Sequence, residues 1–432
     1  MSSVAEVRLW GRRIGAVSLA DEEATASFEY ETAFARSGIE VAPLETPLGP
    51  GVFGFPELSE ETFHGLPGLL ADSLPDRFGN ALINAWLASQ GREPDSLDAV
   101  ERLSYIGERG MGALEFSPAI GPGAAGSDRI DVEELADLAA EALSERTAWT
   151  AKLSGERERA IRQILRVGTS AGGARPKALI ALNPATREIR SGQGDTDPGF
   201  EHWLLKFDGV DDESGDLGRS RGYGAIEYVY SQMARQAGIE MSETALLEEG
   251  GRRHFLTRRF DRLADGSKLH MQSLGALWHL DLNQPGGNSY EQAFGAIRRL
   301  RLGHEAVEQM FRRMTFNVIA RNQDDHVKNI AFLMDRRGRW SLAPAFDLVY
   351  AVGAGWTARH QMSINARRES FTIADFRKVA EGASMKRGRA DRIVDEVTEV
   401  VRGWPELAQD ADIDPGRARP IGDMHRLDLT AR

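Results

Sequence analysis

The feature that most constrains this chain is a polar stretch, residues 321–329, which follows directly after an amphipathic helix pattern. Apolar side chains recur at helical spacing over Glu305–Ala320, which predicts a helix with one buried face. The stretch that follows is Arg-Asn-Gln-Asp-Asp-His-Val-Lys-Asn, in which Asp324 and Asn329 are five residues apart. A predicted hairpin then leads to another acid, Asp347. The polar stretch therefore sits just past the end of the predicted helix, and the residues around it decide what its acids mean.

The composition is that of an ordinary globular protein, and it excludes several classes of protein. With 432 residues, 41% of them hydrophobic and 27% charged, the chain can form a large core in two or more subdomains. It has no cysteine, which excludes disulfides and cysteine metal sites. No run approaches the roughly 20 apolar residues of a membrane span and the start has no signal core, so we expect a cytoplasmic protein. A net charge of −12 argues against binding of nucleic acid through the overall field of the chain.

Periodicity and turn residues divide the chain into three parts. The first, residues 1–120, is predicted to be an amino-terminal β/α module, and a linker rich in Gly, Ala and Pro follows at 118–128. The second part, residues 130–262, has a helical pattern, two strand patterns at 177–182 and 202–207, a helix over 222–238 and a hairpin over 245–260. The third, residues 263–432, is predicted to be mainly helical, with a polar and partly disordered tail from residue 405.

The order of the polar and Gly-rich segments suggests phosphoryl transfer. A Gly-rich turn at 168–173, which contains Gly172 and Gly173, can bring backbone N–H groups close to phosphate oxygens. Lys206, on the second strand, provides a point charge for phosphates, and Glu227 on the following helix is a candidate ion-pair partner. The segment 324–329 and Asp347 then provide carboxylate and amide oxygens, which are ligands that Mg²⁺ prefers. Phosphate loop, lysine, helix, hinge, catalytic loop and metal acid follow one another in this order in two-lobed kinases.

Each of these features also has a plainer explanation. Asp324 and Asn329 could belong to a solvated capping loop, and Lys206 could be an edge residue that extends its ammonium group to water. Asp347 could be a turn aspartate. The segment Gly168–Gly172 matches the nucleophile elbow of serine hydrolases, but that elbow requires a helix directly after the serine, and here a strand pattern follows.

Five short motifs are more specific together than any of them alone. They are Ser170–Lys177, Trp203–Lys206, Arg259–Arg262, Asp324–Asn329 and Ala343–Asp347. With these motifs the chain resembles the HipA-like serine/threonine kinases, which are toxins of type II toxin–antitoxin pairs. The segments Leu9–Gly11 and Ala71–Asp76 resemble the amino-terminal module of that family. The resemblance implies an α+β, two-lobed protein-kinase-like fold with an appended amino-terminal β/α module and a mainly helical C-lobe.

The resemblance also implies a role for each site residue. Asp324 would be the catalytic base, Lys328 could reach a phosphate, and Asn329 and Asp347 would be Mg²⁺ ligands. ATP would be held by Lys206, by the Gly-rich loop with Gly172 and Gly173, and by Phe260 and Asp261 at the adenine end. Ser170 aligns with the serine that family members autophosphorylate, and this modification silences the kinase.

The partners implied by the resemblance are a protein substrate and an antitoxin. Family substrates include aminoacyl-tRNA synthetases, and their phosphorylation stalls translation and produces dormant, drug-tolerant cells. The antitoxin is a small HipB-like helix-turn-helix protein that neutralises the kinase and binds operator DNA. Two alternatives remain open, a catalytically silent co-repressor with the same fold and a kinase of a small molecule. A narrow, enclosed acceptor pocket beside Asp324 would favour the small-molecule kinase.

Overall fold

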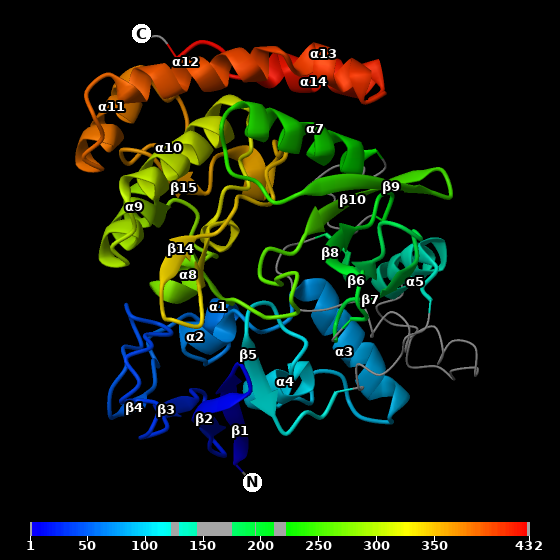
Figure 1. Ribbon diagram of the computed structural model, residues 1–432, viewed down its shortest axis with the longest axis vertical. Coiled ribbons are helices and arrows are strands. Elements are labelled where there is room, and N and C mark those ends of the chain that lie inside the picture. Colours follow the sequence, from blue (N-terminus) through cyan, green and yellow to red (C-terminus); the bar gives the residue numbers. More distant parts are fainter. Residues whose placement is uncertain (1, 122–128, 145–174, 195, 211–221, 430–432) are drawn as a thin grey trace.

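The structure is a computed structural model that describes residues 2–121, 129–144, 175–194, 196–210 and 222–429. It consists of an N-terminal module, a strand-rich lobe and a helical lobe (Figure 1). The N-terminal module and the last helices lie at opposite ends of the molecule, and the strand-rich lobe lies to one side between them (Figure 1). This arrangement confirms the predicted α+β architecture of two lobes with an appended module.

The N-terminal module is built on an antiparallel sheet with the strand order β4-β3-β2-β1-β5. The predicted strand pair is present as β1 and β2, whose register runs from Ser3 opposite Leu19 to Leu9 opposite Arg12. Alternate residues of β1 are buried, as expected for a strand with one face on the core. The strands are β1 (Ser3–Leu9), β2 (Arg12–Leu19), β3 (Ser27–Tyr30), β4 (Val52–Phe53) and β5 (Leu114–Ser117), and the helices are α1 (Glu60–Phe63), α2 (Gly68–Ala71), α3 (Arg77–Ser89) and α4 (Ala99–Ile106).

The strand-rich lobe contains a second antiparallel sheet, in the order β7-β6-β8-β10-β9. Its strands are β6 (Lys177–Leu182), β7 (Ile189–Ser191), β8 (Glu201–Lys206), β9 (Thr244–Glu249) and β10 (Arg252–Arg258). Helix α5 (Val132–Ser144) and helix α3 of the N-terminal module pack together over this sheet. Phe78 and Leu82 of α3 share one core with Ile180 and Leu205 of the sheet. A helix of the first module therefore completes the core of the second unit.

The helical lobe contains the largest core. Helix α7 lies beside the strands β9 and β10, yet its buried residues Tyr230 and Met233 belong to the core of the helical lobe, together with Met310 and Met314 of α10. The helices are α7 (Tyr223–Gln236), α8 (Leu274–Leu277), α9 (Tyr290–Arg299), α10 (His304–Ile319), α11 (Ile373–Gly382), α12 (Arg389–Arg402), α13 (Trp404–Asp410) and α14 (Pro415–Met424).

Short strands and two 3₁₀ turns surround the predicted polar stretch. A small sheet is formed by β11 (His270–Ser273), β13 (Ala331–Met334) and β14 (Trp340–Leu342), and a parallel pair by β12 (Asn288–Ser289) and β15 (Met362–Ser363). The 3₁₀ turns are η1 (Val327–Asn329) and η2 (Gly355–Ala358). The predicted hairpin between the polar stretch and Asp347 is therefore present as β13 and β14.

The prediction of a partly disordered tail from residue 405 is wrong. Residues Trp404–Asp410 and Pro415–Met424 are helices α13 and α14, and Trp404 is buried with its ring centroid 5.5 Å from that of Tyr230. Pro405 and Pro415 lie in the first turns of these helices, where a missing N–H costs nothing, while Pro420 lies inside α14. Residues 187–199, whose polar and Gly-rich sequence predicts a hairpin tip, contain strand β7, which pairs with β6. Most of the predicted linker lies outside the described residues.

Candidate active site

A buried lysine joins the two lobes at the centre of the candidate site. Lys206, the last residue of β8, donates hydrogen bonds to Glu227 Oε1 of α7 at 2.6 Å and to Asp347 Oδ1. The predicted site residues Lys206 and Asp347, which are 141 positions apart, are therefore in direct contact. The ion pair that the helical position of Glu227 suggested is also present.

In this cluster, burial and the neighbouring charges shift the pKa of each group in opposite directions. Burial alone would lower the pKa of Lys206, but the carboxylates of Asp347 and Glu227 raise it above its usual value. Burial would raise the pKa of Asp347, but Lys206 and Lys177 hold it well below its usual range. Burial raises the pKa of Glu227, and Lys206 only partly opposes this effect. Lys206 is therefore charged, and Asp347 is a fixed anion at neutral pH.

Asp347 is held in place by its backbone as well. Its φ of 55° lies in the left-handed region, which non-glycine residues adopt at a cost of order 1–3 kcal/mol. The Asn322 side chain donates to the Asp347 carbonyl at 3.4 Å and to Asn317 Oδ1 at 3.0 Å. Asn322 also forms a parallel bridge with Ala351. These contacts tie the polar stretch to the segment that carries Asp347.

Asp324 lies just beyond α10 and has few partners. Its Oδ1 accepts the indole N–H of Trp356 at 2.6 Å, and His326 Nε2 lies 3.9 Å from the same oxygen. The carbonyl oxygen of Asp324 accepts a hydrogen bond of 3.0 Å from Asn329 Nδ2, which uses the NH₂ end of that amide and not its oxygen. Burial raises the pKa of Asp324, and the opposing effects of His326 and the Trp356 hydrogen bond do not cancel this. Asp324 is thus a carboxylate whose protonation is easier than usual.

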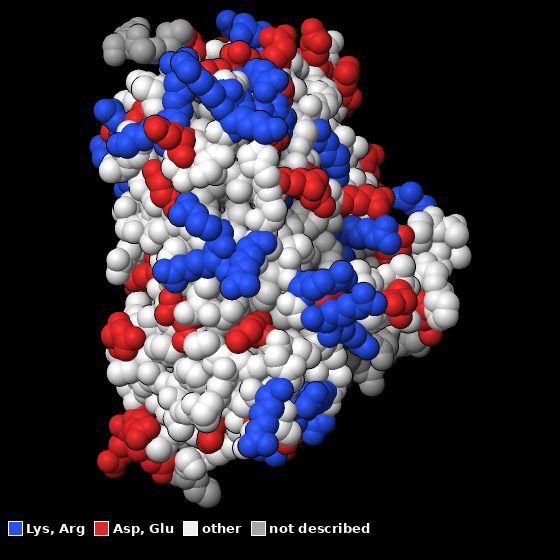
Figure 2. All heavy atoms as spheres, turned by 60° about the vertical axis from the view of Figure 1, so that its left-hand side comes forward, with Lys and Arg blue, Asp and Glu red and all other residues white. Residues whose placement is uncertain are grey.

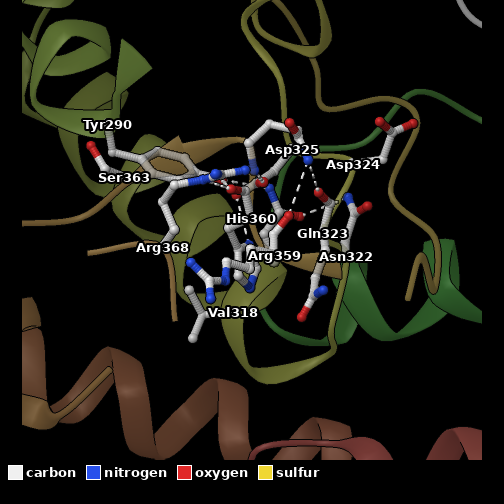
Figure 3. A network of polar contacts seen from close by, with 12 residues as sticks. Tyr290, Val318, Asn322, Gln323, Asp324, Asp325, Arg359, His360, Ser363 and Arg368 are labelled. Atoms are coloured by element: carbon white, nitrogen blue, oxygen red, sulfur yellow. Dashed lines mark hydrogen bonds and ion pairs between the residues drawn. The ribbon is translucent and has the colours of Figure 1, made fainter. Parts of the chain in front are cut away.

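Asp325 faces the opposite way, into the helical lobe. Its side chain is 1% exposed and accepts hydrogen bonds from the Tyr290 hydroxyl at 2.9 Å, His360 Nδ1 at 2.9 Å and the Gln361 backbone N–H at 2.8 Å. Figure 3 shows that Asp325 lies within this network, while the carboxylate of Asp324 points away from it. The two adjacent acids therefore differ in surroundings, and only Asp324 lies on the side of the predicted site.

The end predicted to receive adenine is apolar. The rings of Phe260 and Phe346 lie 5.7 Å apart and belong to a small cluster with Leu333 and Ala343. Phe346 directly precedes Asp347, so this cluster adjoins the ion pairs. Its apolar surface fits the predicted position of a purine ring.

Asp261 has a structural role that the sequence did not suggest. Its carboxylate is fully buried and accepts from Arg259 at 2.6 and 2.9 Å, from Arg262 at 2.6 Å and from the Gly112 backbone N–H at 2.7 Å. Burial would raise the pKa of Asp261, but the two guanidinium groups hold it well below its usual range. The side chain of Asp261 is thus committed to Arg259, Arg262 and the contact with the N-terminal module, and it is not available to a nucleotide.

The remaining predicted residues are placed only in part. Ser170, Gly172 and Gly173 lie outside the described residues. Arg175, which follows the predicted Gly-rich loop, lies with its guanidinium carbon 3.2 Å from the ring centroid of Tyr223. The side chain of Lys328 is half-buried on η1.

The donor set at this site suits a hard cation. Asn329 and Asp347 offer an amide and a carboxylate oxygen, and Mg²⁺ in nucleotide sites is commonly held by one or two such groups together with phosphate oxygens. The part of the chain that the structure describes contains no group of three or more His, Asp or Glu residues that could hold a metal by themselves. A cation at this site would therefore depend on the oxygens of a bound nucleotide.

Several residues of the site were not predicted from the sequence. Trp356 bonds to Asp324 from nine residues beyond Asp347, and Lys177 lies opposite Lys206 in the sheet. His360 and Tyr290 hold Asp325 from 35 residues away on either side. The only signal for any of them was the place of Lys177 at the end of a recognised motif.

Comparison with solved structures identifies the fold. In the complex of the toxin–antitoxin proteins HipA and HipB with operator DNA from Shewanella oneidensis MR-1, a chain matches with a TM-score of 0.67 and 16% identity, covering 97% of this chain and 94% of the other, which establishes the fold. The proinflammatory kinase CtkA of Helicobacter pylori matches at a TM-score of 0.32 and 12% identity, covering 53% of this chain and 88% of that one, which is too low to support an argument.

Sequence comparison gives the family. A protein of Sinorhizobium fredii (strain NBRC 101917 / NGR234) named "Putative kinase Y4mE" is 24% identical over 211 residues, which is 44% of this chain, and the match spans 49% of the length of that relative. Among the described residues no helix is both long enough and apolar enough to cross a membrane. The model of the HipA N-terminal domain matches residues 5–117, and that of the HipA-like C-terminal domain matches residues 169–404, so the chain belongs to the HipA family.

Proposed function

We propose that this protein is an ATP- and Mg²⁺-dependent serine/threonine protein kinase and the toxin of a type II toxin–antitoxin pair. The observation that supports it most is the contact of Lys206 with Glu227 and Asp347, which joins the strand-rich lobe to the helical lobe. A lysine held by a helix glutamate beside a metal-binding aspartate is the arrangement that orients nucleotide phosphates in protein kinases.

The proposed roles follow from the surroundings of each group. Lys206 would contact phosphate oxygens, and Asn329 and Asp347 would hold Mg²⁺, which neutralises charge on the transferred phosphoryl group when bound. Asp324 would accept the proton of the acceptor hydroxyl, since it is the acid on the site side of the segment. Lys328 would add a positive charge near the phosphates. Asp325 would hold the segment in place and would take no part in the chemistry.

The surface charge fits a toxin that meets DNA through a partner. The Shewanella HipA chain was solved with HipB and operator DNA, and we propose a HipB-like helix-turn-helix antitoxin for this protein as well. Figure 2 shows Lys and Arg in several separate groups on the face that it presents, with Asp and Glu between them. Such a face lacks the continuous basic track that duplex binding requires, which agrees with the net charge of −12.

The test is transfer from Mg·ATP in the wild type and in Asp324→Asn. The purified chain is incubated with Mg·ATP, and the modified residue is identified by mass spectrometry, with Ser170→Ala as control. We expect phosphate on Ser170 in the wild type and none in Asp324→Asn. Undiminished phosphate in Asp324→Asn would overturn the proposed base, and phosphate confined to other residues would overturn the autophosphorylation site.

The substrate is tested in cells without an antitoxin. Phosphoproteomes are compared after expression of the wild type and of Asp324→Asn. We expect one translation component, such as an aminoacyl-tRNA synthetase, to lose its phosphoserine or phosphothreonine in the variant. Identical phosphoproteomes would overturn the proposal of a protein kinase.

A silent co-repressor is the second candidate, and one contact favours it. The indole N–H of Trp356 occupies Asp324 Oδ1, one of the two oxygens that could accept the proton of the acceptor. A protein that binds Mg·ATP and the antitoxin but transfers no phosphate in either experiment would be this co-repressor.

A further inference from the structure

The N-terminal module reaches both lobes through one short segment, Asp72–Asp76. Asp76 contacts the strand-rich lobe and Asp72, four residues earlier, contacts the helical lobe. Leu74 between them is buried, and the ring of Pro75 fixes its φ angle, so the segment has little freedom to bend. Neither acid belongs to the site residues proposed above.

Asp76 holds a second buried lysine. Its Oδ2 lies 3.5 Å from Lys177 Nζ, and the two side chains are 4% and 3% exposed. Its Oδ1 accepts the backbone N–H of Gly79 at 2.7 Å and so caps α3. The two carboxylate oxygens of Asp76 therefore have different partners: Oδ1 caps the helix and Oδ2 pairs with Lys177.

Lys177 lies directly opposite Lys206 in the antiparallel pair of β6 and β8. Opposite residues of such a pair project from the same face with Cβ atoms about 4.5–5.5 Å apart, and like charges placed there repel each other. Both ammonium groups are near enough to Asp347 to lower its pKa. Two buried lysines thus project from the same face of the sheet near Asp347, and without nearby acids this arrangement would be strongly unfavourable.

Asp72 connects the same segment to the polar stretch. Its carboxylate accepts the Ser273 backbone N–H at 2.6 Å and the Ser273 hydroxyl at 2.8 Å. Ser273 caps α8, which packs against η1, where Lys328 and Asn329 lie. The charge of Lys328 also acts on Asp72.

We propose that Asp76 is a positioning residue of the kinase site: it holds Lys177 beside Lys206 as a second cation for the nucleotide phosphates, while Asp72 anchors the same segment to the helical lobe. The proposal rests on the proposed kinase function, because a second phosphate cation has a purpose only where a nucleotide binds. The N-terminal module then has a direct part in assembling the site.

The experiment measures binding of two ligands by calorimetry, so that it does not depend on transfer. The ligands are the Mg²⁺ complex of an ATP analogue with a non-transferable γ-phosphate, and adenosine, which lacks phosphates. In Asp76→Asn and in Lys177→Met we expect affinity for the analogue to fall roughly 10- to 100-fold, by analogy with the range seen when the hydrogen-bond partner of a metal ligand is lost. Affinity for adenosine should stay unchanged. The double variant should bind no worse than Lys177→Met, because Asp76 acts through Lys177.

Asp98→Asn is the matched control. Asp98 also caps a helix of the N-terminal module, α4, and its side chain accepts the Glu101 backbone N–H at 2.8 Å, but its second oxygen accepts from the Ser3 hydroxyl, within the N-terminal module. Asparagine is as good a cap as aspartate, so both variants keep the cap and lose one charge. If Asp76→Asn does not fold, Lys177→Arg replaces it, and this charge-conserving change should retain most of the affinity that Lys177→Met loses.

Three results would overturn the proposal: analogue affinity equal to that of the wild type in Lys177→Met, an equal loss for adenosine and the analogue, or an equal loss in Asp98→Asn. A wild type that binds the analogue but transfers no phosphate would overturn the kinase function. The binding data for Asp76→Asn and Lys177→Met would then still decide whether Asp76 positions Lys177 for the phosphates.

Discussion

The two sides of the segment 321–329 differ in the number of hydrogen-bond donors that surround an acid. The acids are the adjacent residues Asp324 and Asp325. On the site side, Asp324 accepts one side-chain hydrogen bond, from Trp356, and its pKa is raised by burial. On the scaffold side, Asp325 accepts three hydrogen bonds and is almost completely buried. Most hydrogen-bond donors around this segment therefore bind Asp325, which holds the segment in place. Asp324, the acid proposed to take up a proton, has few.

This difference shows how one short segment can be both rigid and reactive. A carboxylate that accepts hydrogen bonds from several buried donors is held in one position. A carboxylate with few donors in a buried place accepts a proton more readily, which suits a general base. Adjacent positions give both properties because the side chains of Asp324 and Asp325 point to different sides of the segment (Figure 3).

The largest expected effect is on catalysis, in Asp324→Asn. Loss of the base should lower the rate of phosphoryl transfer by at least about 100-fold, the lower end of general-base contributions. The melting temperature should change little, since an amide oxygen can still accept the Trp356 N–H. Transfer is measured with labelled ATP and folding by calorimetry. A variant that unfolds at a much lower temperature would show that Asp324 belongs to the scaffold as well.

Asp325→Asn should do the reverse and lower the free energy of unfolding by about 3 kcal/mol, the lower range for breaking a buried charged network. Its amide NH₂ would face the donors of Tyr290 and His360. Denaturant unfolding measures the loss, and Asp395→Asn, on the exposed face of α12, is the control that should change nothing. Equal stability of Asp325→Asn and the wild type would contradict the comparison of the two acids.

The C-terminal tail extends the scaffold side, so Arg426→Met should destabilise the protein by about 2 kcal/mol. The guanidinium of Arg426 donates to the Val318 carbonyl at 3.1 Å and to His360 Nε2 at 2.8 Å, behind Asp325. The loss leaves buried acceptors without their donor. Arg402→Met, at a position 58% exposed, is the control for the loss of a surface arginine. A loss as small as that of the control would mean that the tail does not support the segment.

Local patterns in the sequence predicted the helices and strands of the site, and the order of the motifs predicted which of their residues come into contact. The strands of Lys206, the helix of Glu227 and the stretch of Asp324 follow from periodicity and spacing, and the structure brings Lys206, Glu227 and Asp347 into contact. The five-residue step to Asn329 also selected Asp324 over Asp325. The catalytic roles themselves stay predictions.

What the sequence could not show depends on contacts between distant residues. Arg426 supports Asp325 through His360 across 66 positions, and Asp76 meets Lys177 across 101. Such pairs leave no local periodicity, and a buried aspartate looks like a surface aspartate in the sequence. The tail was misjudged for the same reason, since the burial of Trp404 against Tyr230 outweighs the polar composition of α13 and α14.

The smallest expected effect concerns the single donor on the site side. The Trp356 N–H stabilises charged Asp324 and so lowers its pKa, against the larger effect of burial. As the pH falls through the raised pKa of Asp324, the base becomes protonated and the rate should fall tenfold per pH unit. In Trp356→Phe the donor is lost and the pKa rises further, so this acid limb should move to higher pH. A net hydrogen bond of about 0.5–1.5 kcal/mol corresponds to a shift of roughly 0.4–1 pH unit.

The pH profile of kcat/KM measures this shift, and its plateau tests the comparison of the two sides. A limb that moves up with an unchanged plateau means that Trp356 only tunes the base. A plateau that rises manyfold in Trp356→Phe means that the indole blocks Asp324 Oδ1. In the wild type the hydrogen bond between Trp356 and Asp324 would then have to break before transfer. A limb that moves to lower pH would contradict the assignment of Asp324 as the titrating base, because loss of a donor to a carboxylate cannot favour its charged form.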